Sequence, residues 1–155
     1  IDVGAPAADV FSDDAAVERL LAACGSSRAI ATDRSAAYLR WRYRFGPLRY
    51  RAVLVGRSVE DGVVVLRVRR RGEVREVAIC EVLVPGRRRL GPVMSRIARE
   101  TNADHLLRCT GLAGVRDDFL PAAPLGPILT WRPIRRTGVP AMGDLRLALG
   151  DVELF

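Results

Sequence analysis

The sequence has no lysine, no glutamine and a single asparagine, Asn102. All 25 basic residues are therefore arginine, in a chain rich in alanine, valine and glycine. This is the bias that a GC-rich genome produces, because arginine, alanine and glycine have GC-rich codons. The formal net charge of +7 thus reflects codon preference in part, and it does not by itself indicate a nucleic-acid-binding protein. A phosphate-bearing cofactor would suit the same charge.

Long apolar runs and targeting signals are also missing. No run approaches the roughly 20 apolar residues that cross a membrane, and the start, IDVGAPAADV, lacks the regions of a signal peptide. We therefore expect a cytoplasmic protein without membrane association. Because the first residue is Ile1 and not methionine, we also expect an upstream region to precede it.

Metal-binding and nucleophile motifs are absent as well. Cys24, Cys80 and Cys109 are odd in number and far apart, which predicts buried free thiols in a reducing compartment. The single histidine, His105, is expected to be structural or superficial. No cluster has metal-ligand spacing, so we predict no metal. The sequence also has no Walker loop, dinucleotide fingerprint or serine nucleophile elbow.

What is present predicts one α/β domain over residues 1–155, with an N-terminal helical segment at 1–32 and the main part at 33–155. Residue periodicity and turn signals predict helices at 13–24, 32–45 and 90–102, strands at 48–56, 104–111, 126–134 and 144–151, a hairpin at 61–86 and a short helix or turn at 112–120. The strand–helix–strand order around residues 90–102 predicts one parallel pair in an otherwise antiparallel sheet.

The stretch YLRWRYRFGPLRYR alternates arginine with aromatic residues. As a strand it would put arginines and aromatics on opposite faces, whereas a sheet that binds single-stranded nucleic acid presents them together. As a helix it places Tyr38, Trp41 and Phe45 at i, i+3 and i+7. We predict the helix, and we predict that this aromatic ridge belongs to the core and is not a binding surface.

The segment AAYLRWRYRFGPLRYRAVLV resembles a helix and strand of bacterial GNAT-superfamily acetyltransferases, and LALGDVELF resembles that family's C-terminal strand and tail. The resemblance implies a mixed, mostly antiparallel twisted sheet with one parallel crossover and helices on both faces.

A second segment, EVLVPGRRRLGPVMSRIARE, resembles the family's acetyl-CoA-binding strand, loop and helix. Helix N-termini and arginines bind phosphate, and glycine lets the backbone approach it. Val93 stands where the family has glycine or alanine, and Pro92 removes one N–H donor. The residues that the resemblance assigns to acetyl-CoA are Leu83, Val84, Arg87, Arg88, Arg89, Gly91 and Val93. The alternative is that Arg87 to Arg89 form a solvated basic turn.

The same resemblance makes Glu81 the candidate general base, because many GNAT enzymes carry a carboxylate at this strand position. Glu76 is the second candidate, and a charged residue on a solvated strand face is the alternative interpretation of Glu81. An apolar strand would raise the pKa of a carboxylate toward a useful range. The family's tyrosine acid is missing, since Tyr38, Tyr43 and Tyr50 all lie upstream of this segment.

The sequence therefore supports two main hypotheses. The first is an acetyl-CoA-dependent N-acyltransferase that acts on a small-molecule or peptide amine. The second is a catalytically degenerate GNAT-like domain that packs beside an upstream domain of the same chain. A nucleic-acid-binding module would depend on charge alone, and we disfavour it.

Overall fold

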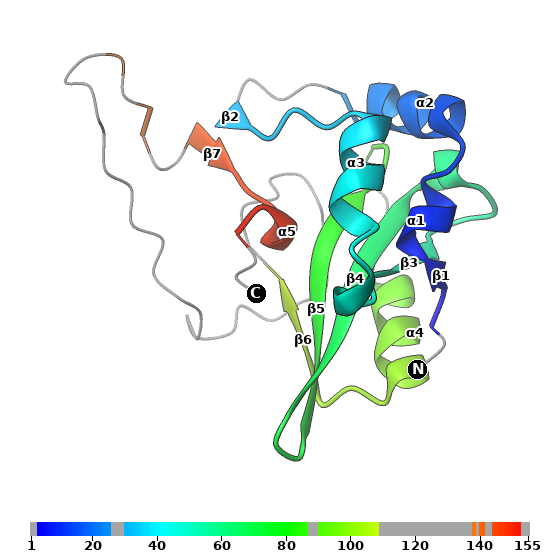
Figure 1. Cartoon of the computed structure of the whole chain (residues 1–155), viewed down its shortest axis with the longest axis vertical. Helices are drawn as coiled ribbons and strands as arrows, with labels where there is room; N and C mark the ends of the chain where they lie inside the picture. Colours follow the sequence, from blue (N-terminus) through cyan, green and yellow to red (C-terminus); the bar gives the residue numbers. More distant parts are fainter. Residues whose placement is uncertain are drawn as a thin grey trace.

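A computed structural model describes residues 3–25, 30–86, 90–108, 138, 140–141 and 144–152. Its main sheet has five strands in the order β1-β3-β4-β5-β6 (Figure 1). The strands are β1 (Ala5–Pro6), β3 (Arg51–Leu54), β4 (Val63–Arg71), β5 (Val74–Leu83) and β6 (His105–Arg108). All neighbours are antiparallel except β5 and β6. The predicted mixed, mostly antiparallel sheet is confirmed, and β5 and β6 are its parallel pair among the described residues.

The two longest strands of the sheet, β4 and β5, form a hairpin. Its turn falls at Gly72 and Glu73, beside the predicted turn at Arg71–Gly72, and Gly72 has the positive φ of 61° that such a turn needs. The register then shifts by one residue, because Leu66 faces Ile79 while Val65 faces Glu81. Cys80 is the extra residue, and it forms a β-bulge directly before Glu81.

Helices cover both faces of the sheet. One core packs α1 (Ala7–Val10), α2 (Asp14–Cys24) and α3 (Ala36–Tyr43) onto one face. A second core packs α4 (Gly91–Thr101) onto the other, through Leu90, Val93, Met94 and Ile97. Both predicted apolar helix patterns are confirmed: Asp13 caps α2 by accepting from the Ala16 N–H, and α4 begins next to Leu90.

The prediction for α3 was right about the helix and wrong about its buried face. Ser35 caps the helix, and its buried residues are Ala36, Leu39 and Tyr43. Trp41 is 62% exposed, and Phe45, which lies beyond the helix end, is 51% exposed. The ridge at i, i+3 and i+7 lies at the surface, because a second set with the same spacing, two positions earlier in the chain, fills the core.

Near the C-terminus the predicted strand at 144–151 is only partly correct. Two residues form β7 (Leu145–Arg146), which pairs in parallel with β2 (Ile30–Ala31), and the chain then turns into the short helix α5 (Leu149–Val152). The 3-10 turns at Gly46–Leu48 and Val59–Asp61 complete the described elements. The short helix or turn predicted at 112–120 and the strand at 126–134 lie outside the described residues, as does Cys109. Cys80 is buried as predicted, whereas Cys24 is only half-buried.

Candidate functional site

Glu81 lies in the buried part of the sheet, next to the Cys80 bulge. Its side chain is 2% exposed, so the solvated-face interpretation is wrong. Its cross-strand partner Val65 belongs to the core beneath α1, α2 and α3, so Glu81 points to that side of the sheet. The bulge makes two consecutive residues, Cys80 and Glu81, share this side, which simple strand alternation forbids.

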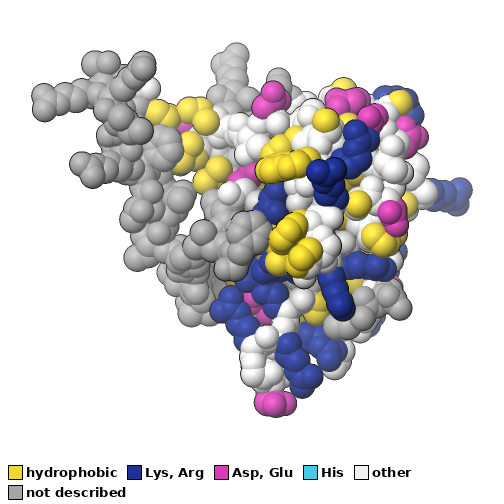
Figure 2. Space-filling view, in the orientation of Figure 1, with side chains coloured by type: hydrophobic (Ala, Val, Ile, Leu, Met, Phe, Trp, Pro, Cys, Tyr) yellow, Lys and Arg dark blue, Asp and Glu magenta, His cyan; other side chains and the backbone are white. Residues whose placement is uncertain are grey.

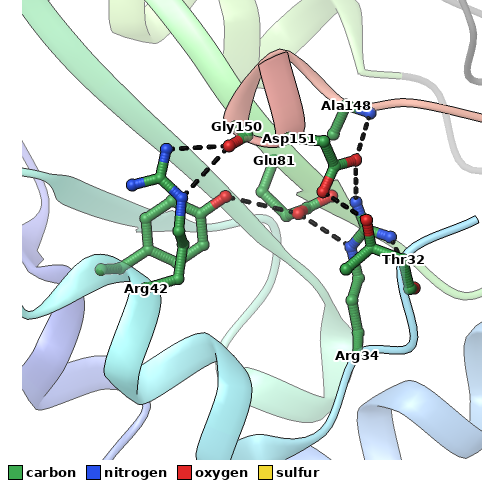
Figure 3. A network of polar contacts seen from close by, with 8 residues as sticks. Thr32, Arg34, Arg42, Glu81, Ala148, Gly150 and Asp151 are labelled. Atoms are coloured by element: carbon green, nitrogen blue, oxygen red, sulfur yellow. Dashed lines mark hydrogen bonds and ion pairs between the residues drawn. The ribbon is translucent and has the colours of Figure 1, made fainter. Parts of the chain in front are cut away.

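Arg34 joins Glu81 to a second carboxylate (Figure 3). The Arg34 Nε donates to Glu81 Oε2 at 2.8 Å, and its Nη2 donates to Asp151 Oδ2 at 2.8 Å. The side chains are 13%, 2% and 5% exposed for Arg34, Glu81 and Asp151 respectively. One guanidinium thus bridges two carboxylates inside the protein, and it brings together β5, α5 and the segment before α3.

Further hydrogen bonds fix each carboxylate. The Tyr43 hydroxyl lies 3.3 Å from Glu81 Oε2 and donates to it. Asp151 accepts from the Thr32 hydroxyl at 2.7 Å and from the Ala148 N–H at 2.7 Å. We call Arg34, Tyr43, Glu81 and Asp151 the buried network. Its acceptors are well supplied with donors, as buried carboxylates require.

Gly150 holds α5 against this network. The Arg42 guanidinium donates to the Gly150 carbonyl through Nε at 3.1 Å and through Nη2 at 2.8 Å (Figure 3). A Cβ at Gly150 would lie 2.9 Å from the Cys80 carbonyl oxygen and closer still to the Tyr43 hydroxyl. Only glycine fits at this close approach between α5 and β5.

Burial shifts the acidity of the network. Burial raises the pKa of Glu81, and the opposing effect of Arg34 does not cancel it. Burial and the nearby Glu81 charge hold the pKa of Tyr43 well above its ordinary value, so this hydroxyl stays protonated. For Arg34, burial lowers the pKa, but Glu81 and Asp151 outweigh it and the guanidinium stays charged. Glu81 therefore takes up a proton more readily than an exposed glutamate.

A cavity of about 940 Å³ opens beside the network. Thr32, Arg42, Gly150 and Asp151 belong both to its wall and to the contacts described above. Three aromatic side chains also line the cavity, Tyr38, Trp41 and Phe45. Figure 2 shows apolar and basic side chains side by side on this face. The cavity thus combines planar apolar walls with a polar end, which is typical of small-molecule sites.

The second candidate base, Glu76, belongs to a different neighbourhood. It lies at the start of β5, where it faces His105 across the parallel pair, with 3.2 Å between Glu76 Oε2 and His105 Nε2. Arg71 Nε is 3.8 Å from its other oxygen. The two predicted carboxylates therefore do not form one site. His105 is half exposed and contacts Glu76, in line with its expected structural role.

The predicted acetyl-CoA segment is only partly described. Leu83 is buried at the end of β5, Val84 is half-buried, and Gly91 and Val93 lie in the first turn of α4. Leu90 gives that turn no side-chain cap, and Pro92 supplies no N–H. Arg87, Arg88 and Arg89 lie outside the described residues. Among the residues that are described, no group of three or more potential metal ligands comes together, and no helix has the length and apolar character to span a membrane.

The sequence patterns did not identify three members of the network. Arg34 and Asp151 are 117 residues apart, and neither was singled out as a site residue, although Asp151 lies within the segment LALGDVELF. Tyr43 was assigned to the aromatic stretch as one apolar residue among several. Its i+7 spacing from Ala36 and i+4 spacing from Leu39, the true inward positions of α3, was the available signal. No protein-family model, no curated protein and no solved structure matches the chain.

Proposed function

We propose that the chain is an acyl-CoA-dependent N-acyltransferase domain, which in the simplest case transfers an acetyl group to an amine. The observation that carries the proposal is the position of Glu81. A carboxylate with a raised pKa follows a β-bulge and accepts a hydrogen bond from a tyrosine, on the strand that leads into the first turn of α4.

Glu81 is suited to act as the base. An attacking amine must lose a proton as its nitrogen bonds to the acyl carbon and the carbon–sulfur bond breaks. Glu81 would accept that proton, and Tyr43, which keeps its own proton, would hold the carboxylate in one orientation. Water would protonate the departing thiolate. The acyl-CoA supplies the activated thioester.

The end of β5 and the start of α4 fit the cofactor in part. The N–H groups of Gly91 and Val93 have no side-chain cap and suit a pyrophosphate, while Pro92 contributes no donor. Leu83 and Val84 would lie along the pantetheine chain. The amine would enter from the aromatic cavity, whose wall includes Asp151 next to the network.

A second candidate function is a catalytically inactive domain of the same type. The enclosure of Glu81 favours it, because Arg34 already pairs with the carboxylate and α5 packs against β5 at Gly150. In such a domain the network would stabilise the fold, and the chain would act by packing beside another domain.

A thermal melt with acetyl-CoA separates the two. A ligand at 100 times its Kd adds about 2.7 kcal/mol, which is about 5–10 °C for a domain of this size. Desulfo-CoA and ATP serve as controls. A shift with acetyl-CoA that ATP does not produce supports the transferase, and no shift favours the inactive domain.

Activity then tests the base. Thiol release from acetyl-CoA in the presence of a panel of amines is measured for the unchanged chain, Glu81→Gln and the matched control Glu76→Gln. We expect Glu81→Gln to lower the rate by about 10²–10⁴-fold, and Glu76→Gln to leave it within a few fold. Equal losses in both variants would overturn the assignment of Glu81.

A further inference from the structure

A second hollow lies at the other end of β5 from the first turn of α4. Its volume is about 680 Å³, and β1, the turn after α3, β3 and the β4–β5 hairpin line it. Six arginines line it, namely Arg44, Arg49, Arg51, Arg69, Arg70 and Arg75. No aspartate or glutamate is among the described lining residues. We call this surface the arginine hollow, and in Figure 2 basic side chains gather over the lower part of the molecule, above the hairpin turn.

The described contacts of three of these arginines leave their charge largely unneutralised. Arg51 donates to the carbonyls of Val3 and Gly4, and Arg75 donates to the carbonyl of Thr101, so both guanidinium groups are held by neutral partners. Arg70 lies 3.7 Å from Glu73, whose side chain is 98% exposed, and such a pair neutralises little in water. A concave surface lined by one sign of charge concentrates the potential and attracts anions.

The arginine hollow continues into the aromatic cavity. Arg44, Phe45 and Gly46 line both. Trp41, 62% exposed, lies in the aromatic part with its ring 6.0 Å from that of Tyr38. The surface thus presents guanidinium groups and planar rings in succession. The sequence predicted that the aromatic ridge is buried, but Trp41 and Phe45 are exposed and adjoin the arginine hollow, so a nucleic-acid surface no longer depends on charge alone.

We propose that this continuous surface binds single-stranded nucleic acid, with phosphates in the arginine hollow and unpaired bases on Trp41 and Phe45. Arginine is the side chain best suited to phosphate, through paired N–H donors. An exposed ring can stack on a base only when that base is not already paired and stacked in a duplex. The inference does not rest on the acyltransferase proposal, because the arginine hollow lies at the opposite end of β5 from the first turn of α4, but both proposals use the aromatic cavity.

The test is fluorescence anisotropy with labelled 12-nucleotide single-stranded DNA and RNA, the matching duplex, and polyglutamate as an acidic polymer without bases. The full 155-residue chain is titrated from 50 to 200 mM salt. We expect the single strands to bind more tightly than the duplex or polyglutamate. Trp41→Ala should weaken that binding by about 5- to 140-fold, because base stacking contributes about 1–3 kcal/mol per base.

Arginine variants test the electrostatic part. Arg44→Gln with Arg70→Gln should reduce the slope of log K against log salt by about 1.4, at about 0.7 per phosphate contact. The matched control is Arg57→Gln with Arg99→Gln, since both residues are exposed and neither lines the hollow. Melts verify that all variants fold.

Three results would each overturn the proposal. The first is that no single strand binds at 50 mM salt. The second is that polyglutamate or the duplex binds as tightly as the single strands. The third is that both double arginine variants lose the same amount of affinity. A preference for single-stranded RNA over single-stranded DNA, or the reverse, would support the proposal and identify which nucleic acid the surface prefers.

Discussion

The buried network and the arginine hollow both contain arginine, but they differ in whether carboxylates lie beside the guanidinium groups. In the network one arginine meets two carboxylates inside the protein, and every charged group has partners from the chain. In the hollow six arginines share a concave surface whose described lining includes no carboxylate. The difference indicates that the network's charges are satisfied within the fold, whereas Arg44, Arg49 and Arg70 of the hollow are exposed to solvent.

The largest expected effect comes from removing the guanidinium at the centre of the network. Arg34→Met should lower the free energy of unfolding by about 3–5 kcal/mol, because it leaves two buried carboxylates without their cation. Urea denaturation measures the change. The control is Arg19→Met, whose pair with Glu60 is exposed and should contribute about 0–1 kcal/mol. Similar losses in both variants would contradict the contrast between buried and exposed charge.

The packing that closes the network should give the next largest effect. Gly150→Ala would force α5 away from Cys80 and Tyr43, at a cost of about 1–3 kcal/mol. Gly46→Ala is the matched control, because a Cβ there meets nothing within 4 Å. Its effect should stay within about 0.5 kcal/mol. Thermal melts followed by near-UV circular dichroism or fluorescence measure both variants. Equal midpoints would contradict the close packing of α5 against β5.

A pH dependence follows from Glu81. Since its pKa in the folded chain lies above the ordinary 4.5, the folded chain holds that proton more tightly than the unfolded chain. The resulting stability is fully present below pH 4.5 and is lost as the pH rises through the folded pKa. The stability of the unchanged chain minus that of Glu81→Gln should therefore fall as the pH rises above 4.5. A difference that is constant, or that grows with pH, would contradict the burial effect.

The smallest effect on stability is expected in the hollow. Arg44→Gln with Arg70→Gln should change the free energy of unfolding by less than about 0.5 kcal/mol, since these side chains are exposed. Any change should be a gain at low salt, because the substitutions relieve repulsion among arginines. Denaturation at two salt concentrations checks this. A loss as large as that of Arg34→Met would mean that the hollow is part of the structural core.

Local patterns predicted most of the elements. The capping residue Asp13, the period-two runs around Gly72 and the apolar face of α4 each specify an element from adjacent residues, and all three are confirmed. The inward face of α3 was not predictable in the same way. Two sets of residues fit helical spacing, and the neighbours from α1 and α2 decide which set is buried.

The candidate site was less predictable than the fold. The resemblance identified Glu81 as a candidate, but it gave no indication of its partners. Arg34 lies 47 residues upstream of Glu81, and Tyr43 lies 38 residues upstream. Strand alternation would also have put Glu81 on the same face as Val77 and Ile79, whereas the bulge puts it on the opposite one. Only the folded arrangement brings these groups together.

The bulge at Cys80 also bears on the length of β5. At the bulge β5 has one more residue than β4, and Cys80 is that extra residue. If Cys80 were deleted, Ile79 and Val82 would stay on one face of the sheet, and Glu81 and Leu83 would stay on the other. A deletion at the bulge therefore leaves the buried faces of β5 unchanged. A deletion at a regular position of the strand would move every following side chain to the opposite face. An alignment of this chain with a relative that lacks the bulge must open a gap at Cys80, or it will match Glu81 to the wrong residue.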